Sequence, residues 1–268
     1  MTSGPHTPGE IAFASYLNQR GLPFQYEPFT TGPNPDFVVL HPRSGTVLVD
    51  VYEPSYLLAR NPDGSIQSGF GSSPDDDLRN GFKSKKRQAD VARKQANPFV
   101  LLFARTRSEI GFDQHNVPGA LFGSLAIVGP VGDAVRSNWN LRIVFGQGGR
   151  LQRNMNRRFS AAAVITAFNP GQRRVEQIID EQMSGIEDPR QRIATAFRIF
   201  REETERHHFE DGDRLHCLQV FHNPFAEIPL PNDFAGPHDE QWAVCDGAYQ
   251  AVAQGIGRNT VPGIEVIK

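Results

Sequence analysis

The sequence has few cysteines, no long apolar run and no strong excess of either charge sign. Two cysteines, Cys217 and Cys245, stand among 268 residues, too few for a disulfide framework. No apolar run approaches the roughly 18 residues that a membrane helix needs. The first ten residues lack the basic start and apolar stretch of a secretory signal. We therefore expect a cytoplasmic globular protein with no membrane partner.

The charge is nearly balanced overall but is segregated along the chain. Lysine and arginine total 28 against 30 aspartates and glutamates, a net charge of −2, which excludes a uniformly basic surface. Two runs are nevertheless basic: Lys83 to Lys94 holds six basic residues and one acid, and Arg136 to Arg158 holds six arginines and no acid. Each run alone is typical of a solvated surface. Together they favour a polyanionic partner, because a local basic face is enough to neutralise phosphates.

Hydrophobic periodicity and turn residues divide the chain into alternating helices and strands. Helices are predicted at Glu10 to Arg20, Leu78 to Ala96 with Asp77 as N-cap, Asp188 to His207, and Asp239 to Ala253. Strands are predicted at Leu22 to Glu27, Asp36 to Leu40, Thr46 to Tyr52, Phe99 to Ala104, Phe159 to Phe168, and Leu215 to His222. The stretch Gly119 to Val128 fits neither pattern clearly.

This order predicts a single α/β domain over residues 1–268, with a mixed sheet flanked by helices. A helical insertion covers about residues 170–210, and the last segments form a C-terminal extension. The short, turn-rich connection between the strands at Asp36 and Thr46 predicts an antiparallel hairpin.

Two aspartates lie at positions that this hairpin would bring together. Asp36 begins the first strand of the hairpin and Asp50 lies near the end of the second, so both fall at one edge of the sheet. Side chains alternate along a strand, which places Asp50 and Tyr52 on the face opposite to Val49 and Val51. Two converging carboxylates form a hard-oxygen site suited to Mg²⁺ or Mn²⁺.

These residues, in this structural order, resemble the restriction-endonuclease-like superfamily, whose signature is PD-(D/E)-x-K. The matching pieces are Glu10 on the first helix, Pro35-Asp36, and Asp50-Val51-Tyr52. The order of helix, strand, hairpin, helix and strand is also similar to the core of that superfamily. The resemblance covers about the first hundred residues, with the motifs between residues 10 and 104.

The sequence departs from the signature at its lysine, because Tyr52 occupies that position. A neutral phenol cannot supply the ammonium that orients water and offsets charge at a phosphate. Relatives sometimes carry this lysine on the following helix, and Lys85 is the candidate here. It interrupts the otherwise apolar helical stripe Leu78, Phe82, Ala89, Ala92 and Ala96, and Gln88 follows one turn later.

The resemblance implies a divalent-metal-dependent nuclease that hydrolyses phosphodiester bonds of nucleic acid, with DNA favoured, in a role such as prokaryotic defence. Asp36 and Asp50 would hold Mg²⁺ or Mn²⁺. Glu10 would assist, Lys85 would replace the missing lysine beside Gln88, and Tyr52 would line the site. The phosphate backbone would be bound by the basic residues Lys83, Lys86, Arg150, Arg153, Arg157 and Arg158. Many such proteins act as dimers, so a homodimer is one further expectation.

Two other interpretations stay open at the level of sequence. The chain could be a binding or assembly module that has kept the nuclease fold and lost catalysis, as Tyr52 suggests. Alternatively, Asp50 and Lys85 could form an ion pair that joins helix to sheet with no metal, and Glu10 could simply favour the helix dipole as a first-turn acid. Glu27 and Glu53 are expected to be solvated or paired rather than metal ligands.

Overall fold

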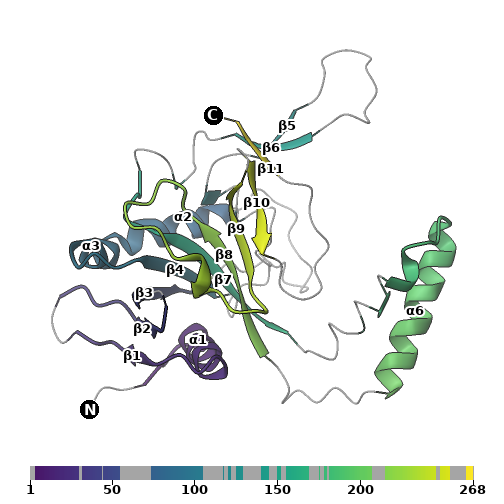
Figure 1. The fold of residues 1–268 in the computed structure, drawn as a ribbon, viewed down its shortest axis with the longest axis horizontal. Helices are drawn as coiled ribbons and strands as arrows, with labels where there is room; N and C mark the ends of the chain where they lie inside the picture. The colour runs from purple at the N-terminus through teal and green to yellow at the C-terminus, as the bar shows by residue number, and fades with distance from the viewer. Residues whose placement is uncertain are drawn as a thin grey trace, which may run out of the picture.

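The computed structural model describes residues 4–29, 32–43, 45–54, 74–104, 117, 120–121, 125–128, 140–144, 150–151, 155–168, 175, 178–179, 181–206, 215–245, 248–253 and 264–267. Their strands form one mixed sheet in the order β1-β2-β3-β4-β7-β8-β9-β10-β11-β6-β5. Helices pack on both of its faces (Figure 1). The predicted α/β class with a mixed sheet flanked by helices is thus confirmed.

The predicted hairpin forms the centre of the N-terminal part of the sheet. Strand β1 (Phe24–Tyr26) pairs with β2 (Phe37–His41), which pairs antiparallel with β3 (Gly45–Tyr52). Strand β4 (Phe99–Ala104) then lies parallel to β3. A parallel neighbour needs a long crossover, and the chain supplies it between β3 and β4.

Helix α1 (Pro8–Gln19) covers one face of the sheet. It begins with a capping box, in which Thr7 accepts from the backbone of Glu10 and Glu10 accepts from the backbone of Thr7. Its buried residues Phe13 and Leu17 share a core with the odd-numbered residues of β3, such as Val49. The other face of β3 is therefore left to its even-numbered residues.

The described part of the crossover between β3 and β4, residues 74–98, contains two helices, α2 (Pro74–Ser84) and α3 (Lys86–Lys94), where the sequence predicts one. Helix α2 begins at Pro74 and not after Asp77, because proline is tolerated in the first turn and acidic residues there favour the helix dipole. The helix breaks at Lys85, which has φ −97° and ψ 13°. Ala96 lies beyond the end of α3, exposed and with φ 56°, so it is wrongly included in the predicted stripe.

The remaining members of that stripe are buried as predicted. Phe82 packs with the ring of Phe103 on β4, and Leu78, Ala89 and Ala92 belong to the same core. Strand β7 (Ala161–Phe168) lies parallel to β4, and β8 (Leu215–His222) pairs antiparallel with β7. Both strands occupy the positions that the sequence predicts.

The predicted C-terminal helix at residues 239–253 is wrong. This segment forms strands β9 (Glu240–Cys245) and β10 (Ala248–Ala253). Strand β9 pairs with β8, and the ring of Trp242 stacks on Phe221 at a centroid distance of 6.0 Å. Pairing with an existing strand and burial of a large aromatic side chain outweigh local helix propensity.

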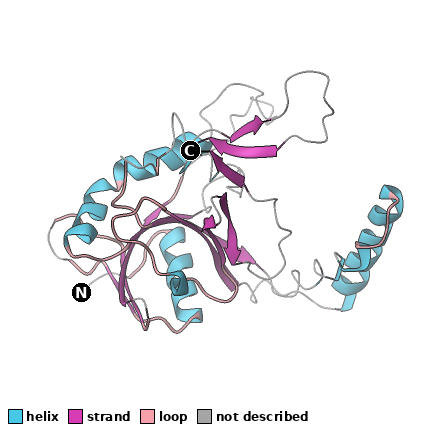
Figure 2. Ribbon diagram, turned by 45° about the horizontal axis from the view of Figure 1, so that its top comes forward, coloured by secondary structure: helices cyan, strands magenta, loops and turns pink. Residues whose placement is uncertain are grey.

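Three further strands extend the sheet beyond β10, namely β5 (Leu125–Val128), β6 (Asn140–Val144) and β11 (Ile264–Ile267). Strand β5 accounts for part of the stretch 119–128 that the sequence pattern leaves unassigned. Within the predicted insertion, α6 (Pro189–Arg206) confirms the helix predicted at 188–207. Two views show α6 set apart from the sheet (Figure 1, Figure 2).

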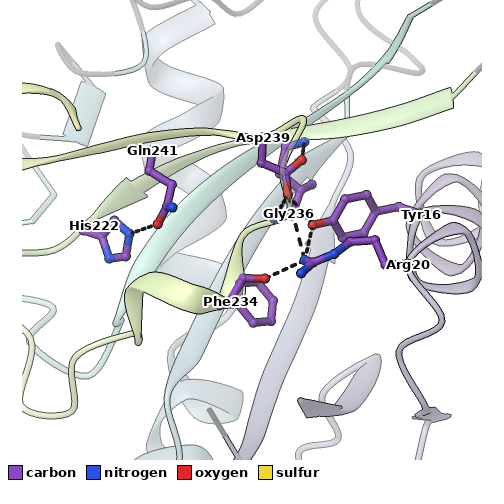
Figure 3. A network of polar contacts seen from close by, with 8 residues as sticks. Tyr16, Arg20, His222, Phe234, Gly236, Asp239 and Gln241 are labelled. Atoms are coloured by element: carbon purple, nitrogen blue, oxygen red, sulfur yellow. Dashed lines mark hydrogen bonds and ion pairs between the residues drawn. The ribbon is translucent and has the colours of Figure 1, made fainter. Parts of the chain in front are cut away.

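A polar network fastens α1 to the C-terminal part of the chain (Figure 3). The buried carboxylate of Asp239 accepts hydrogen bonds from the hydroxyl of Tyr16 at 2.5 Å and from the backbone of Leu218 at 2.7 Å. Arg20 donates to the carbonyl of Phe234 at 2.5 Å, within the short 3₁₀ helix η4 (Asn232–Phe234). These bonds hold α1 against β8 and the segment that precedes β9. None of the described helices is long and apolar enough to cross a membrane.

Candidate functional site

Asp50 is a buried carboxylate toward the end of a strand of the sheet. It lies on β3 and faces α2 and α3, as do its neighbours Leu48 and Tyr52. Its side chain is 0% exposed, and among the described residues neither of its oxygens has a hydrogen-bond partner of regular geometry. A buried charge without hydrogen bonds is costly unless it is paired. The position therefore requires a cation, a proton or both.

Asp36 stands beside Asp50, as the sequence predicts. Phe37 pairs with Val49 across the hairpin, so the register places Asp36 level with Asp50. Oδ2 of Asp36 accepts a hydrogen bond from the backbone N–H of Val51 at 2.7 Å. That bond anchors the carboxylate at the end of the hairpin.

Lys85 supplies a cation to this pair. Its ammonium contacts Oδ1 of Asp50 from the break between α2 and α3, with 21% of the lysine side chain exposed. The predicted ion pair between sheet and helix is thus present. An ion pair in this place does not exclude a metal site, since a metal ion would need the same carboxylate oxygens.

The electrostatics of the three groups are strongly linked. Burial, and then the adjacent charge of Asp36, raise the pKa of Asp50 to about 8 in spite of Lys85. Burial also raises the pKa of Asp36, although Lys85 and the Val51 hydrogen bond oppose the shift. Burial lowers the pKa of Lys85, but the two aspartates outweigh that effect and raise it. Two buried carboxylates side by side repel each other when both are ionised. A divalent cation bound between them would offset that repulsion.

Gln88, predicted to lie beside Lys85, is partly buried on α3, one turn further along. Its Oε1 is buried and has no hydrogen-bond partner within the part of the chain that the structure describes. A buried amide oxygen without a partner is rare. It is therefore a candidate acceptor for a water molecule or ligand near this end of the sheet.

Glu10 approaches the site only through its charge. Its Oε2 accepts hydrogen bonds from the backbone of His6 at 2.9 Å, from the backbone of Thr7 at 3.0 Å and from the hydroxyl of Tyr26 at 2.9 Å. The contact with Thr7 closes the capping box of α1. Glu10 is thus an acid of the first turn, as the simpler of its two sequence-based roles has it, but the sequence reasoning named the helix dipole and not this cap. Its charge nevertheless acts on both Asp36 and Lys85.

Tyr52, at the lysine position of the signature, packs against an aromatic wall below α2. Its ring meets Phe103 edge to face at a centroid distance of 6.0 Å. Gly81 of α2 lies directly above, where an added Cβ would come within 3.1 Å of Tyr52 Cδ1 and 2.8 Å of Phe103 Cε1. The absence of a side chain at Gly81 therefore allows α2 to approach the sheet, which sequence reasoning missed.

Glu53 also has a defined structural contact. Its Oε1 accepts a hydrogen bond from the backbone N–H of Gly9 in the first turn of α1. Glu53 is thus paired, as one of the two sequence-based expectations has it. The local sequence around Glu53 does not predict this contact. It forms only because α1 packs over the end of β3 in the folded protein.

The two basic runs meet in the structure. Arg158 donates to Asp90 of α3 at 2.5 Å, and Arg93 of the same helix lies 3.5 Å from Glu227. The backbone N–H of Glu227 in turn donates to the carbonyl of Arg157 at 2.8 Å. Segments far apart in the sequence therefore form one neighbourhood on the α3 side.

The predicted phosphate-binding residues differ in their accessibility. The exposed ones are Lys83, Lys86 and Arg157. Arg150 and Arg158 are partly buried, the latter in its ion pair with Asp90. Arg153 lies outside the described residues.

The donor set of the site is small. Within the described ranges, no group of three or more histidine, cysteine, aspartate or glutamate side chains is arranged to hold a metal ion. Asp36 and Asp50 therefore form a two-carboxylate site that Glu10 and Glu53 do not join. Mg²⁺ commonly binds through one or two carboxylates and completes its shell with water and substrate oxygens.

Comparison of this chain with protein-family models, with curated proteins and with solved structures finds no match in any of the three. The functional interpretation therefore rests on the residues and their geometry.

Proposed function

We propose that this protein is a divalent-metal-dependent nuclease that hydrolyses phosphodiester bonds in nucleic acid, with DNA favoured. One observation carries the proposal: the hairpin brings Asp36 and Asp50 together in a buried position beside Lys85. Buried like charges at the end of a sheet are costly and are typical of functional sites. Resemblance to the restriction-endonuclease-like superfamily points to prokaryotic defence as the setting.

The residues present fit Mg²⁺ or Mn²⁺ as the cofactor. Asp50 offers two buried oxygens, of which Oδ1 contacts the ammonium of Lys85, and Asp36 offers the oxygen that Val51 does not engage. Both are hard donors, which suit these ions. Such an ion, when bound, supplies a water of lowered pKa and neutralises charge at the phosphate.

The chain's own groups have distinct roles in this proposal. Asp36 and Asp50 hold the cation, and Lys85, once it leaves Asp50, offers its ammonium to a phosphate oxygen. Gln88 orients a water through its unpaired amide oxygen. Tyr52 forms the wall of the site, and Glu10 contributes through its negative charge.

The basic residues near α3 support a nucleic-acid substrate. Lys83 and Lys86 flank Lys85 and are exposed, and Arg157 is exposed on the neighbouring segment. Lys83 and Lys86, next to Lys85 in the sequence, would hold a phosphate backbone in register with the reacting bond, and Arg157 would bind it further along.

The direct test is cleavage of supercoiled plasmid and single-stranded DNA with Mg²⁺, Mn²⁺ or EDTA. We expect metal-dependent cleavage by the wild type and none by Asp50→Asn, which preserves the shape of the side chain and removes its charge. Asp76→Asn is the matched control, since Asp76 is an exposed aspartate on α2. Equal cleavage by wild type and Asp50→Asn would refute the site.

A second candidate is a nucleic-acid-binding module without catalysis. Tyr52 in the lysine position and Lys85 in its ion pair with Asp50 favour it. This version predicts that the wild type binds DNA without cleaving it in any metal, and that charge reversal at Lys83 and Lys86 abolishes binding. If the protein neither binds nor cleaves DNA and Mn²⁺ does not stabilise it, the remaining interpretation is that Asp50 and Lys85 form a purely structural ion pair.

A further inference from the structure

The outward face of α3 is basic. Lys86, Arg87 and Lys94 are exposed, and helical spacing places them within about 100° of one another around the helix axis. None of the three has an ion-pair partner among the described residues. Ala89 and Ala92, toward the other side of the helix, are buried in the core. The three cations are therefore directed to solvent.

The acids of this neighbourhood are already paired. Asp90, the one acid in the sequence of α3, lies between the exposed cations on the same face. Its carboxylate accepts a hydrogen bond from Arg158 at 2.5 Å and lies 3.7 Å from Arg93. Glu227, on the neighbouring segment, lies 3.5 Å from Arg93. The arginines offset both acids, so the exposed cations set the sign of the potential at this surface.

The basic face begins beside the carboxylate site. Lys85, which contacts Asp50, is the residue that immediately precedes α3. From Lys86 to Lys94 the helix advances by about 12 Å. Phosphates of one strand of a DNA duplex follow one another every 3.4 Å along the duplex axis. The face is thus long enough to follow the backbone over about four nucleotides.

The residue types on this face distinguish between anionic partners. Helix α3 has no aromatic residue and no exposed large hydrophobic one. Proteins that bind single strands stack the bases on aromatic side chains, and helices that bind membrane surfaces insert apolar ones. Among the described residues, the exposed aromatic side chains are Phe197 and Phe200 of α6, which both ribbon views show set apart from the sheet (Figure 1, Figure 2). Cations without aromatic side chains suit the backbone of a duplex.

We propose that the nucleic acid bound by this protein is double-stranded, and that the backbone of one of its strands lies along the outward face of α3. Lys86, Arg87 and Lys94 bind its phosphates. The inference rests on the proposed function and adds to it the class of substrate and its path beyond the carboxylate site. Because the contacts are to phosphates, they hold the duplex without reading its sequence.

The test is fluorescence anisotropy of a short labelled DNA duplex at several salt concentrations, in EDTA so that no metal-dependent cleavage occurs. Arg87→Gln and Lys94→Gln should each bind roughly tenfold more weakly at about 0.1 M salt. Each should also reduce the slope of log K against log salt by about 0.9, the contribution of one phosphate contact. Arg43→Gln is the matched control, because Arg43 is an exposed cation in the turn between β2 and β3. Unchanged binding by both α3 variants, or an equal loss in the control, would contradict the path.

Two further measurements address the duplex and the acid on its path. The wild type should bind the duplex more tightly than a single strand of the same sequence, and equal or tighter binding of the single strand would overturn the duplex assignment. Asp90→Asn should bind the duplex more tightly than the wild type, since it removes a negative charge and releases Arg158 and Arg93 to phosphates. Weaker binding by this variant would contradict contact of the backbone with this face.

Cleavage and binding separate this inference from the proposed function. If the duplex binds through α3 but no metal supports cleavage, the nuclease proposal fails and the path along α3 stands. If the wild type cleaves DNA and the α3 variants bind it as the wild type does, the path fails and the nuclease proposal stands.

Discussion

Lys85 reaches from the break between α2 and α3 to the buried carboxylate of Asp50 on β3. The pair joins the helical layer to the sheet at the point where the two aspartates of the hairpin meet. A metal ion would need the oxygens of Asp50 that the lysine now contacts. The same contact is therefore a structural link and a competitor for a cofactor.

Breaking this pair should destabilise the protein more than removing it altogether. At a pH above about 8, where Asp50 is ionised, Lys85→Met leaves this carboxylate buried without a cation, and we expect a loss of about 3 kcal/mol, the low end for a broken buried pair, because Asp50 can take up a proton. The double variant Lys85→Met with Asp50→Asn should recover most of this loss. Urea unfolding of the two single variants and the double variant measures the coupling. Simple additivity of the two single effects would show that the pair contributes no coupling.

Mn²⁺ should stabilise the folded protein by binding Asp36 and Asp50, and the stabilisation should be larger when Lys85 does not occupy Asp50. We expect a rise in the melting temperature of the wild type with Mn²⁺ through linkage, and no rise for Asp50→Asn. Lys85→Met should show a larger rise than the wild type, because the competing ammonium is gone. Lys83→Met removes an exposed lysine at the end of α2 and should behave like the wild type. An equal rise in every variant would indicate binding elsewhere.

The stability of the protein should fall with rising pH across the titration of Asp50. In the unfolded chain this carboxyl releases its proton near a pH of about 4, and in the folded protein its pKa is about 8. Between these values the folded state binds more protons, so the free energy of unfolding decreases as pH rises. Asp50→Asn should lose this part of the slope. Parallel pH profiles for wild type and variant would contradict the burial of a protonated Asp50.

The close approach of α2 to the sheet should depend on Gly81. In Gly81→Ala the new Cβ would lie 2.8 Å from Phe103 Cε1, so the helix or the rings must move. Overpacking of this kind costs roughly 1–3 kcal/mol, against a gain of up to about 1 kcal/mol in helix propensity. We expect a net loss in thermal unfolding. Gly185→Ala, with nothing within 4 Å of the added atom, should be nearly neutral.

Much of the N-terminal half could be predicted from local patterns. The hairpin of β2 and β3 follows from its turn residues, and the buried strand β4 has the bounds that its apolar run predicts. Alternation along β3 correctly separates Asp50 from Val49 and Val51. Hydrophobic periodicity and the residues that favour turns are properties of short segments, so they can be recognised from the sequence alone.

Other features depend on partners distant in the sequence. The segment 239–253 has a helix-like pattern, yet it forms strands because β8 offers an open edge and Phe221 a ring for Trp242 to cover. The helix predicted at 78–96 breaks where Lys85 meets Asp50. The contact of Glu53 with the start of α1 has no local signal at all.

The sequence by itself determined that two aspartates converge at the end of a hairpin, with a lysine on the following helix. Only the tertiary structure decided the state of that site. It buries Asp50, directs Lys85 onto it and turns Glu10 into a helix cap. The physical reason is that burial and charge interactions act through space, and the groups that set the pKa of Asp50 come from different elements of the fold.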